Sequence, residues 1–484
     1  MEMSNFNSKL ISNEKINEIR TKIENVVWDN KESKITSAAL LLTEDCNLNC
    51  VYCFENNRRN KAKMSPEVAI SAVEFLIKGA KLENKKDFSF TFFGGEPTLN
   101  IPIMNLVFDY ATYRAKEEDM FCGFTIITNG VIFNEELKTF YKKWKDHSGN
   151  INVQLSIDGP PDIQNANRPF ANGAPSSDII ENNIKEYVKY FKELNCNKYN
   201  LHVHSVINRN SVGRLFEIYK YFLDLGLEKI WFMPCHEEPW EDEDVEIFKS
   251  EKQKIADYIY EKCLLENSAE FLGSYSSLER CNVQHPGKTC GIGFNYGTIA
   301  ANGKLYPCHS VYFKDPEMII GDVLEGIDNI EARRFFLDYT SANVFGDMPC
   351  GECDNYTCYR CLGQNYAANG NFLIGFPQYC KLSRAEDEIR QELRKKLINK
   401  GLLTEQNNSK SCSCGGECSC GSGDNGEADR KAILQVLEQL DKKLLFMEEN
   451  FIMLNNKVDG LIEINNILSE ALLNLLSSGE NTNE

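Results

Sequence analysis

Short apolar runs alternate with amphipathic segments over the first half of the chain. The runs have the length of buried strands, and the segments between them carry apolar residues at helical spacing. Strands are expected at residues 36–43, 88–93, 124–128, 151–157, 201–207 and 230–233, and helices at 65–78, 101–115, 135–144, 179–194 and 214–225. This order predicts an α/β fold over residues 36–235, with a parallel sheet curled into a partial TIM-like (β/α)6 barrel.

The segments on either side of this barrel follow other patterns. Residues 1–35 are polar, with one possible helix at 14–27. Residues 236–280 read as a helical bridge, whose charged helix at 241–266 is expected to face solvent. Residues 298–307 predict a hairpin, because Asn302-Gly303 is a strong turn signal between short apolar runs.

The last part of the chain carries an apolar seam with alternating spacings of four and three. It runs from Ile433 to Leu475 and predicts a C-terminal coiled-coil helix over residues 428–478. A polar residue, Asn465, occupies one seam position and is suited to fixing register. A homo-oligomer or a partner helix through residues 430–476 is therefore expected; an amphipathic helix folded back on the barrel is the alternative.

Charge and hydropathy limit the kinds of partner that the protein is expected to bind. The 484 residues include 71 acidic and 53 basic ones, a formal net charge of −18, which disfavours nucleic acid. The N-terminus is polar, and no apolar run approaches membrane-spanning length. These features predict a cytoplasmic protein of several units with no membrane contact.

The chain has 19 cysteines, which without a secretion signal point to metal rather than disulfides. Four isolated cysteines are expected to pack as small apolar residues: Cys122, Cys196, Cys235 and Cys263. Four more lie between Cys412 and Cys420, inside a flexible Gly/Ser-rich linker at 403–427. That cluster is open to three interpretations: a likeness to a thioether-forming peptide substrate, a soft-metal site, or a cluster-delivery tail.

The most informative motif is Cys46-x-x-x-Cys50-x-x-Cys53, directly after the first expected strand. Three thiolates at this spacing can ligate three irons of a [4Fe–4S] cluster and leave the fourth iron open. Zinc is the alternative, but it would need a fourth Cys or His close by, and the neighbouring sequence has none.

Polar or glycine-rich elements follow the next four expected strands, where a parallel barrel places its functional groups. Gly94-Gly95-Glu96-Pro97 follows the second strand, and Asn129 the third. Ser156 ends the fourth strand, with Arg168 twelve residues further on, and Asn208 follows the fifth. Each alone is a common turn sequence; their coincidence with successive strand ends predicts a binding site.

These motifs together resemble the radical SAM family. The resemblance implies that Cys46, Cys50 and Cys53 hold the catalytic cluster, whose open iron binds S-adenosylmethionine. It also implies that Tyr52 packs near the adenine and that backbone carbonyls of Gly94, Gly95, Glu96 and Pro97 hold the amino group. Ser156 and Arg168 are expected to bind the carboxylate or ribose, with Asn129 and Asn208 as further cofactor contacts.

Eight more cysteines lie between Cys281 and Cys380. Residues 281–385 resemble the SPASM extension of radical SAM enzymes, which implies two auxiliary [4Fe–4S] clusters and three in all. The first would use Cys281, Cys290, Cys308 and Cys361, and the second Cys350, Cys353, Cys358 and Cys380. The spacings are tighter than usual for this extension, so the division of ligands stays open, and the CxxC core alone would also fit zinc.

The resemblance to radical SAM/SPASM peptide maturases covers residues 36 to about 385. It implies oxidative modification of a Cys-rich ribosomal peptide, most simply a thioether crosslink, with electrons from a flavodoxin- or ferredoxin-type donor. Sulfatase-type maturation or epimerisation is a second hypothesis. His309 stands where sulfatase-maturing members carry an aspartate base, which weighs against the sulfatase type. A non-enzymatic iron–sulfur scaffold is the third hypothesis.

Overall fold

The fold is taken from a computed structural model that describes residues 8–53, 61–149, 151–236, 238–274, 290–341, 355, 358, 361–375 and 377–404. The chain divides into two compact units, Met1–Ser413 and Cys414–Glu484, and the described residues all belong to the first. The predicted coiled coil and the cysteines Cys281, Cys350, Cys353 and Cys412–Cys420 lie outside the described residues.

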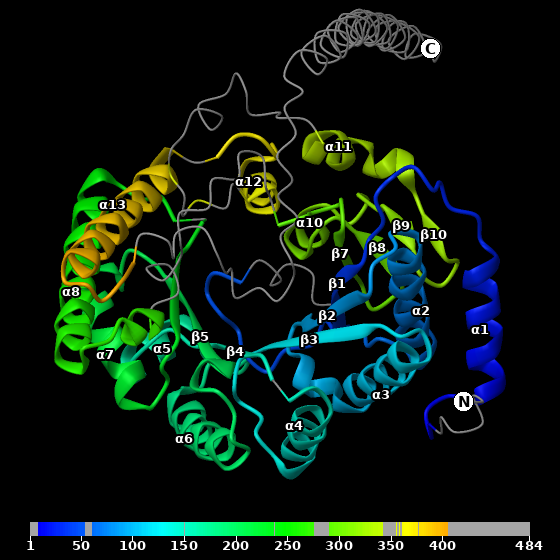
Figure 1. The fold of residues 1–484 in the computed structure, drawn as a ribbon, viewed down its shortest axis with the longest axis horizontal. Coiled ribbons are helices and arrows are strands. Elements are labelled where there is room, and N and C mark those ends of the chain that lie inside the picture. Colours follow the sequence, from blue (N-terminus) through cyan, green and yellow to red (C-terminus); the bar gives the residue numbers. More distant parts are fainter. Residues whose placement is uncertain are drawn as a thin grey trace, which may run out of the picture. The chain divides into compact units, whose positions relative to one another are not determined.

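Six parallel strands form one continuous part of the sheet and neighbour each other in chain order. This confirms the predicted order of strands, which Figure 1 shows as a curved sheet. The strands are β1 (Ser37–Thr43), β2 (Asp87–Gly94), β3 (Phe121–Thr128), β4 (Val153–Ser156), β5 (Leu201–Ile207) and β6 (Ile230–Pro234).

Helices connect these strands and cover the sheet face that points away from the cavity described below (Figure 1). The side chain of Ser65 accepts a hydrogen bond from the Val68 amide and caps α2, as predicted. The short helix α5 was not expected. The connecting helices are α2 (Pro66–Leu82), α3 (Ile101–Glu117), α4 (Glu135–Ser148), α5 (Pro161–Asn167), α6 (Ser177–Glu193) and α7 (Leu215–Asp224). A further helix, α1 (Asn13–Asn25), precedes β1 and packs on α2.

The sheet continues beyond β1 with four strands from the second half of the chain. β7 (Tyr296–Ile299) pairs parallel with β1, and β8 (Lys304–Tyr306) returns antiparallel to it. Gly303 turns this hairpin at a φ of 84°, which confirms the predicted hairpin. β9 (Gly321–Asp322) and β10 (Ile327–Asp328) extend the antiparallel part, and β6 and β10 are the two edges of the ten-stranded sheet.

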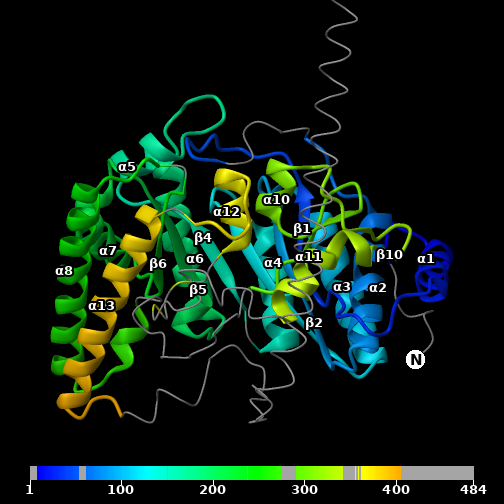
Figure 2. The ribbon, with the colours of Figure 1, turned by 90° about the horizontal axis from the view of Figure 1, so that it is seen from above.

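The charged helix α8 (Asp242–Glu266) corrects one expectation, because it does not simply face solvent. It packs against α7 and against α13 (Pro377–Asn399), which lies beside it in both views (Figures 1 and 2). The ammonium of Lys252, almost fully buried, donates to Glu386 of α13 at 2.6 Å. The acidic residues in the first turn of α8 therefore do not predict which face of the helix is buried further along.

Two short helices of the later segment, α10 (His309–Lys314) and α12 (Leu362–Asn369), pack against each other, and α10 contacts β7 and β8. The longer helix α11 (Ile330–Ser341) belongs to the same segment. A small apolar cluster separate from the main core joins these three helices to the segment before β7; it is made of Ile292, Cys308, Val311, Phe336 and Leu362. Of the helices in the described part of the chain, none has the length and apolar character needed to cross a membrane.

Candidate active site

A cavity of about 590 Å³ opens at the carboxyl ends of the parallel strands. The side chains of β2 and β3 alternate in burial, because one face packs on the helices and the other faces this space. Most of the predicted site residues line it: Cys46, Cys50, Tyr52, Cys53, Gly94, Gly95, Glu96, Asn129, Ser156, Arg168, Cys290, Cys308, Cys358, Cys361 and Cys380.

The cysteine loop is held by a segment more than a hundred residues away in the sequence. Asn49 N donates to Pro169 O at 2.8 Å, and Val51 N donates to Asn167 O at 2.9 Å. In the opposite direction, Ala171 N donates to Asn47 O at 3.0 Å. These bonds between main chains fix the loop whatever its side chains are, so no sequence signal marks them.

The two glycines after β2 are required by backbone contact. A Cβ on Gly95 would collide with the carbonyl oxygen of Asp45, and one on Gly94, at a φ of 132°, with that of Thr43. Gly95 N donates to Thr43 O at 2.8 Å, and Glu96 N donates to Asp45 O at 2.9 Å. The glycines therefore let the end of β2 approach the chain that leads into the cysteine loop.

The carboxylate of Glu96 ties the end of β2 to the end of β3. It is buried, which raises its pKa, while hydrogen bonds from Thr98, Asn129 and Thr128 act in the opposite direction. The hydroxyl groups of Thr98 and Thr128 donate to it at 2.6 and 2.7 Å, and Asn129 N donates at 2.7 Å. Its side chain thus has an internal partner for each oxygen and acts as a brace.

Asp158 lies at the end of β4 and is fully buried. Tyr52 Oη donates to its Oδ2 at 2.5 Å, Arg168 Nε donates to its Oδ1 at 3.0 Å, and Val206 N donates to the same oxygen at 3.2 Å. The guanidinium carbon of Arg168 lies 5.3 Å from the centre of the Tyr52 ring. Burial lowers the pKa of Arg168, but the charges of Asp158, Tyr52 and Cys50 outweigh it and hold the pKa well above its usual range.

Two cysteine sulfurs of the loop accept hydrogen bonds from the surrounding protein. Leu48 N and Asn129 Nδ2 donate to Cys46 Sγ at 3.5 and 3.8 Å, and Arg168 Nη1 donates to Cys50 Sγ at 3.7 Å. Such donors stabilise thiolates that carry a metal cluster. Asn129 Nδ2 also donates to the side chain of Asn47 at 2.7 Å.

The donor set suits an iron–sulfur cluster. Among the described residues, no group of three His, Cys, Asp or Glu side chains could hold a single metal ion. A [4Fe–4S] cluster instead spreads its cysteine ligands over different irons. Three thiols on one loop, lining a common cavity and supported by donors to their sulfurs, meet that requirement.

A second set of thiols, Cys290, Cys308 and Cys361, lines the same cavity. Burial and the charge of Cys308 raise the pKa of Cys290, and burial with the charges of Cys308 and Cys290 raises that of Cys361 to about 12. A Cβ on Gly363 would lie 3.0 Å from Cys308 Sγ, so the glycine lets α12 pack closely against this group. Three of the four cysteines expected to share an auxiliary cluster thus lie close together.

Three histidines also line the cavity: His204 of β5, His236 after β6 and His309 of α10. Burial is the main cause that lowers the pKa of each to about 4, so all three are neutral at pH 7. The His309 ring packs on Phe93, with centroids 4.8 Å apart. Nε2 of His236 is buried and has no hydrogen-bond partner among the described residues, and its ring stacks on Tyr379 at 4.3 Å.

Two residues that were predicted to contact the cofactor do not line the cavity. Pro97 begins the 3-10 turn after Glu96 and is not among the residues that line the cavity. Asn208 is also absent from the lining; its side chain donates to Asn167 at 2.9 Å and so supports the segment that holds the cysteine loop. Asp158, His204 and His236 were not singled out from the sequence, although Asp158 follows an expected strand.

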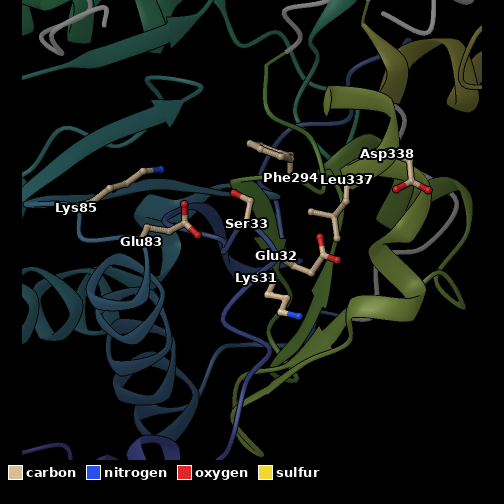
Figure 3. Close-up of a pocket in the computed structure, with 8 residues that line it drawn as sticks. All are labelled: Lys31, Glu32, Ser33, Glu83, Lys85, Phe294, Leu337 and Asp338. Carbon is tan, nitrogen blue, oxygen red and sulfur yellow. The ribbon is translucent and has the colours of Figure 1, made fainter. Parts of the chain in front are cut away.

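A second cavity, of about 530 Å³, lies at the amino ends of β1, β2 and β7 (Figure 3). Its lining mixes both charges and contains no cysteine: Lys31, Glu32, Ser33, Glu83, Lys85, Phe294, Leu337 and Asp338. Since the cysteine loop follows the carboxyl end of β1, this cavity is at the other end of the parallel strands.

Comparisons with known proteins place this site in context. Residues 40–219 match the family model "Radical SAM superfamily". A cysteine-type anaerobic sulfatase-maturating enzyme of Clostridium novyi is 26% identical over 337 residues, which is 66% of this chain and 84% of that protein. The radical SAM cyclopropyl synthase TigE of Paramaledivibacter caminithermalis is 31% identical over 174 residues, 34% of each chain.

Among solved structures, native anSMEcpe with bound AdoMet and Cp18Cys peptide is similar to this chain with a TM-score of 0.57. The match has 20% sequence identity and covers 76% of this chain and 99% of that one. At this identity the likeness shows a shared fold, which extends beyond the six parallel strands.

Proposed function

We propose that this chain, whose residues 40–219 belong to the Radical SAM superfamily, is an enzyme that cleaves S-adenosylmethionine and oxidatively modifies a peptide. One observation carries the proposal: a single cavity is lined both by Cys46, Cys50 and Cys53 and by the thiols of the later segment. A substrate in that cavity would lie between the place where a radical forms and a place that can accept an electron.

Cys46, Cys50 and Cys53 would hold the first cluster. A reduced [4Fe–4S] cluster with bound S-adenosylmethionine supplies a 5′-deoxyadenosyl radical, which removes a hydrogen atom from a C–H bond. The protein holds the cysteine loop through the main chain of Asn167–Ala171, and most of the side chains that line the site are apolar or uncharged, with Arg168 as a charged exception. Exclusion of water in this way protects a reactive intermediate from side reactions.

The cofactor contacts belong to the same proposal. Gly94, Gly95 and Glu96 present main chain to the cavity, and Ser156 and Arg168 present polar side chains to it. Arg168 is held by Asp158 and bonded to Cys50, so its assigned contact with the carboxylate or ribose would use the remaining donors of the guanidinium.

The later segment is proposed to be a SPASM extension with two auxiliary clusters. The meeting of Cys290, Cys308 and Cys361 supports the first ligand set, which Cys281 would complete. Cys358 and Cys380 line the same cavity and support the second set, with Cys350 and Cys353. Three [4Fe–4S] clusters would require about twelve irons per chain.

Two products are supported to a similar degree. Thioether crosslinking of a Cys-rich peptide is the first, and sulfatase-type maturation is the second, favoured by the sulfatase-maturating relative. His309, a neutral imidazole in the cavity, stands where the second reaction would call for an aspartate base. Epimerisation and a scaffold without turnover remain as lesser alternatives.

The proposal also includes a partial barrel and a cytoplasmic location. It further includes electron transfer from a flavodoxin- or ferredoxin-type donor and self-association through residues 430–476.

The test is anaerobic reconstitution with iron and sulfide, followed by reduction with S-adenosylmethionine. We expect about twelve irons per chain and release of 5′-deoxyadenosine. Mass spectrometry of a Cys-rich peptide encoded beside the gene should then show loss of two hydrogens for each crosslink. Full iron content with no 5′-deoxyadenosine would support the scaffold, and far fewer irons would contradict three clusters.

A further inference from the structure

The carboxylate of Asp158 joins three parts of the site. It accepts hydrogen bonds from Tyr52 in the cysteine loop, from Arg168 after α5 and from the main chain of β5 at Val206. Its own main chain is fixed as well, because Asp158 N donates to Gln164 Oε1 at 3.1 Å. Asp158 has no exposed surface, so its charge is balanced by these groups and not by water.

Arg168 reaches the cysteine loop from this carboxylate. Its Nε donates to Asp158 Oδ1 at 3.0 Å, and its Nη1 donates to Cys50 Sγ at 3.7 Å. Its side chain is 9% exposed and is stacked over the Tyr52 ring. Because the guanidinium is planar, its bond to the carboxylate fixes the direction in which Nη1 points.

We propose that Asp158 is a positioning residue that holds the charge of Arg168 against the sulfur of Cys50 and so raises the reduction potential of the cluster bound there. The inference rests on the proposed function, since it requires a cluster on the cysteine loop. A positive charge and a hydrogen bond at a ligand sulfur stabilise the reduced cluster, which carries one more negative charge. Asp158 does not touch the cluster in this scheme; it acts through Arg168.

The sign of the potential shift separates this role from a simple charge effect. Asp158 is itself negative, so removing its charge while Arg168 stays in place would make reduction easier. Removing both the charge and the acceptor would release Arg168 and make reduction harder. Asp158→Asn keeps a side-chain oxygen for Arg168, whereas Asp158→Leu keeps the branching at Cγ but has no acceptor.

The experiment measures the midpoint potential of the full-length, reconstituted chain by EPR-monitored titration, following the signal that changes when S-adenosylmethionine is added. We expect the midpoint potential of Asp158→Asn to equal or exceed that of the wild type. We expect Asp158→Leu to shift the reduction equilibrium about tenfold toward the oxidised form, which is about 59 mV for one electron. A rise in potential for Asp158→Leu would overturn the inference.

The chain offers a matched control in a second buried pair. Arg333 Nη1 donates to Asp328 at 2.6 Å, and neither side chain has exposed surface. Asp328→Leu should reduce thermal stability to a similar degree and leave the potential unchanged. An equal potential shift in Asp328→Leu would show that general loss of packing is responsible, and would also overturn the inference.

Variants of Arg168 keep the test decisive if Asp158→Leu does not fold. Arg168→Gln should lower the potential about as much as Asp158→Leu, and Arg168→Lys, which keeps the charge, by less. A wild-type potential in Arg168→Gln would overturn the inference. If the EPR signal of the wild type does not respond to S-adenosylmethionine, both the proposed function and the inference fail. If the wild-type signal responds but the potentials of the variants shift in the wrong direction, only the inference is overturned.

Discussion

Cys46, Cys50 and Cys53 lie on one loop that is bonded through its main chain to Asn167–Ala171, whereas Cys290, Cys308 and Cys361 come from three separate segments. The cysteine loop is anchored in the main hydrophobic core, because its residues Leu48 and Cys50 belong to that core. Cys308 instead belongs to the small apolar cluster with Val311 and Phe336.

This difference concerns what holds each cysteine group without metal. The first group is placed by parallel strands, glycine contacts and a buried ion pair, and these contacts join protein groups to each other. In the second group burial and neighbouring thiols raise the pKa values of Cys290 and Cys361, so deprotonation for metal binding costs more than it would for an exposed thiol. We therefore expect the first site to be organised before its cluster arrives, and the second to gain more of its stability from the bound metal.

The largest expected effect separates the two groups by function. Cys46→Ala removes a ligand of the catalytic cluster and should reduce 5′-deoxyadenosine release to background, measured by chromatography after reduction. Cys263→Ala, at a buried cysteine of α8 far from the cavity lining, is the control and should retain release. Release at the wild-type rate from Cys46→Ala would contradict the assignment of the loop.

The second prediction applies the same change to the other group. Cys308→Ala should lose about four irons per chain, while S-adenosylmethionine cleavage without peptide continues. Modification of the peptide should stop, because the electron left after hydrogen abstraction has no acceptor. Iron analysis and peptide mass spectrometry measure the two effects, and unchanged iron content would exclude Cys308 as a ligand.

The third prediction tests whether the loop is organised by its backbone contacts. Gly95→Ala forces a Cβ against the carbonyl oxygen of Asp45 and should cost about 2–4 kcal/mol in free energy of unfolding. The control is Gly149→Ala, where no described residue lies within 4 Å of the added atom and only the φ of 68° adds a cost, about 1–2 kcal/mol. Denaturant unfolding of the metal-free chain gives both values, and a cost for Gly95→Ala no larger than that for Gly149→Ala would contradict the close contact.

The smallest effect concerns His204, at the floor of the shared cavity. Its folded-state pKa of about 4, lowered by burial and by the charge of Arg168, lies below the ordinary value of 6.5. The unfolded chain therefore takes up the proton first, and stability is lost as pH falls from about 6.5 toward 4. His204→Phe should reduce this loss by about 1–3 kcal/mol, measured by urea unfolding of the metal-free chain at pH 7.5 and 5. An identical pH dependence in the variant would contradict the burial of a neutral imidazole.

Much of the fold was accessible from periodicity. The six parallel strands were predicted in the correct order, and β5 at its observed bounds, because buried parallel strands are continuous apolar runs. The early start of β3 at Phe121 was missed since Gly123 interrupts its apolar pattern, and α5 was missed because it is a helix of only seven mostly polar residues. The burial of α8 was wrongly expected to be slight, because its partner α13 comes more than a hundred residues later.

For the site, local spacing identified the residue types and tertiary contact assigned several roles. The sequence by itself determined the cysteine loop, the glycines after β2 and the polar residues at strand ends, since each is a local pattern tied to a strand. Only the tertiary structure decided that Asn167–Ala171 holds the loop, that Glu96 is a brace, and that Arg168 joins Asp158 to Cys50. The physical reason is that these contacts join main-chain groups and buried charges far apart in the chain, and such pairings leave no periodic trace in the sequence.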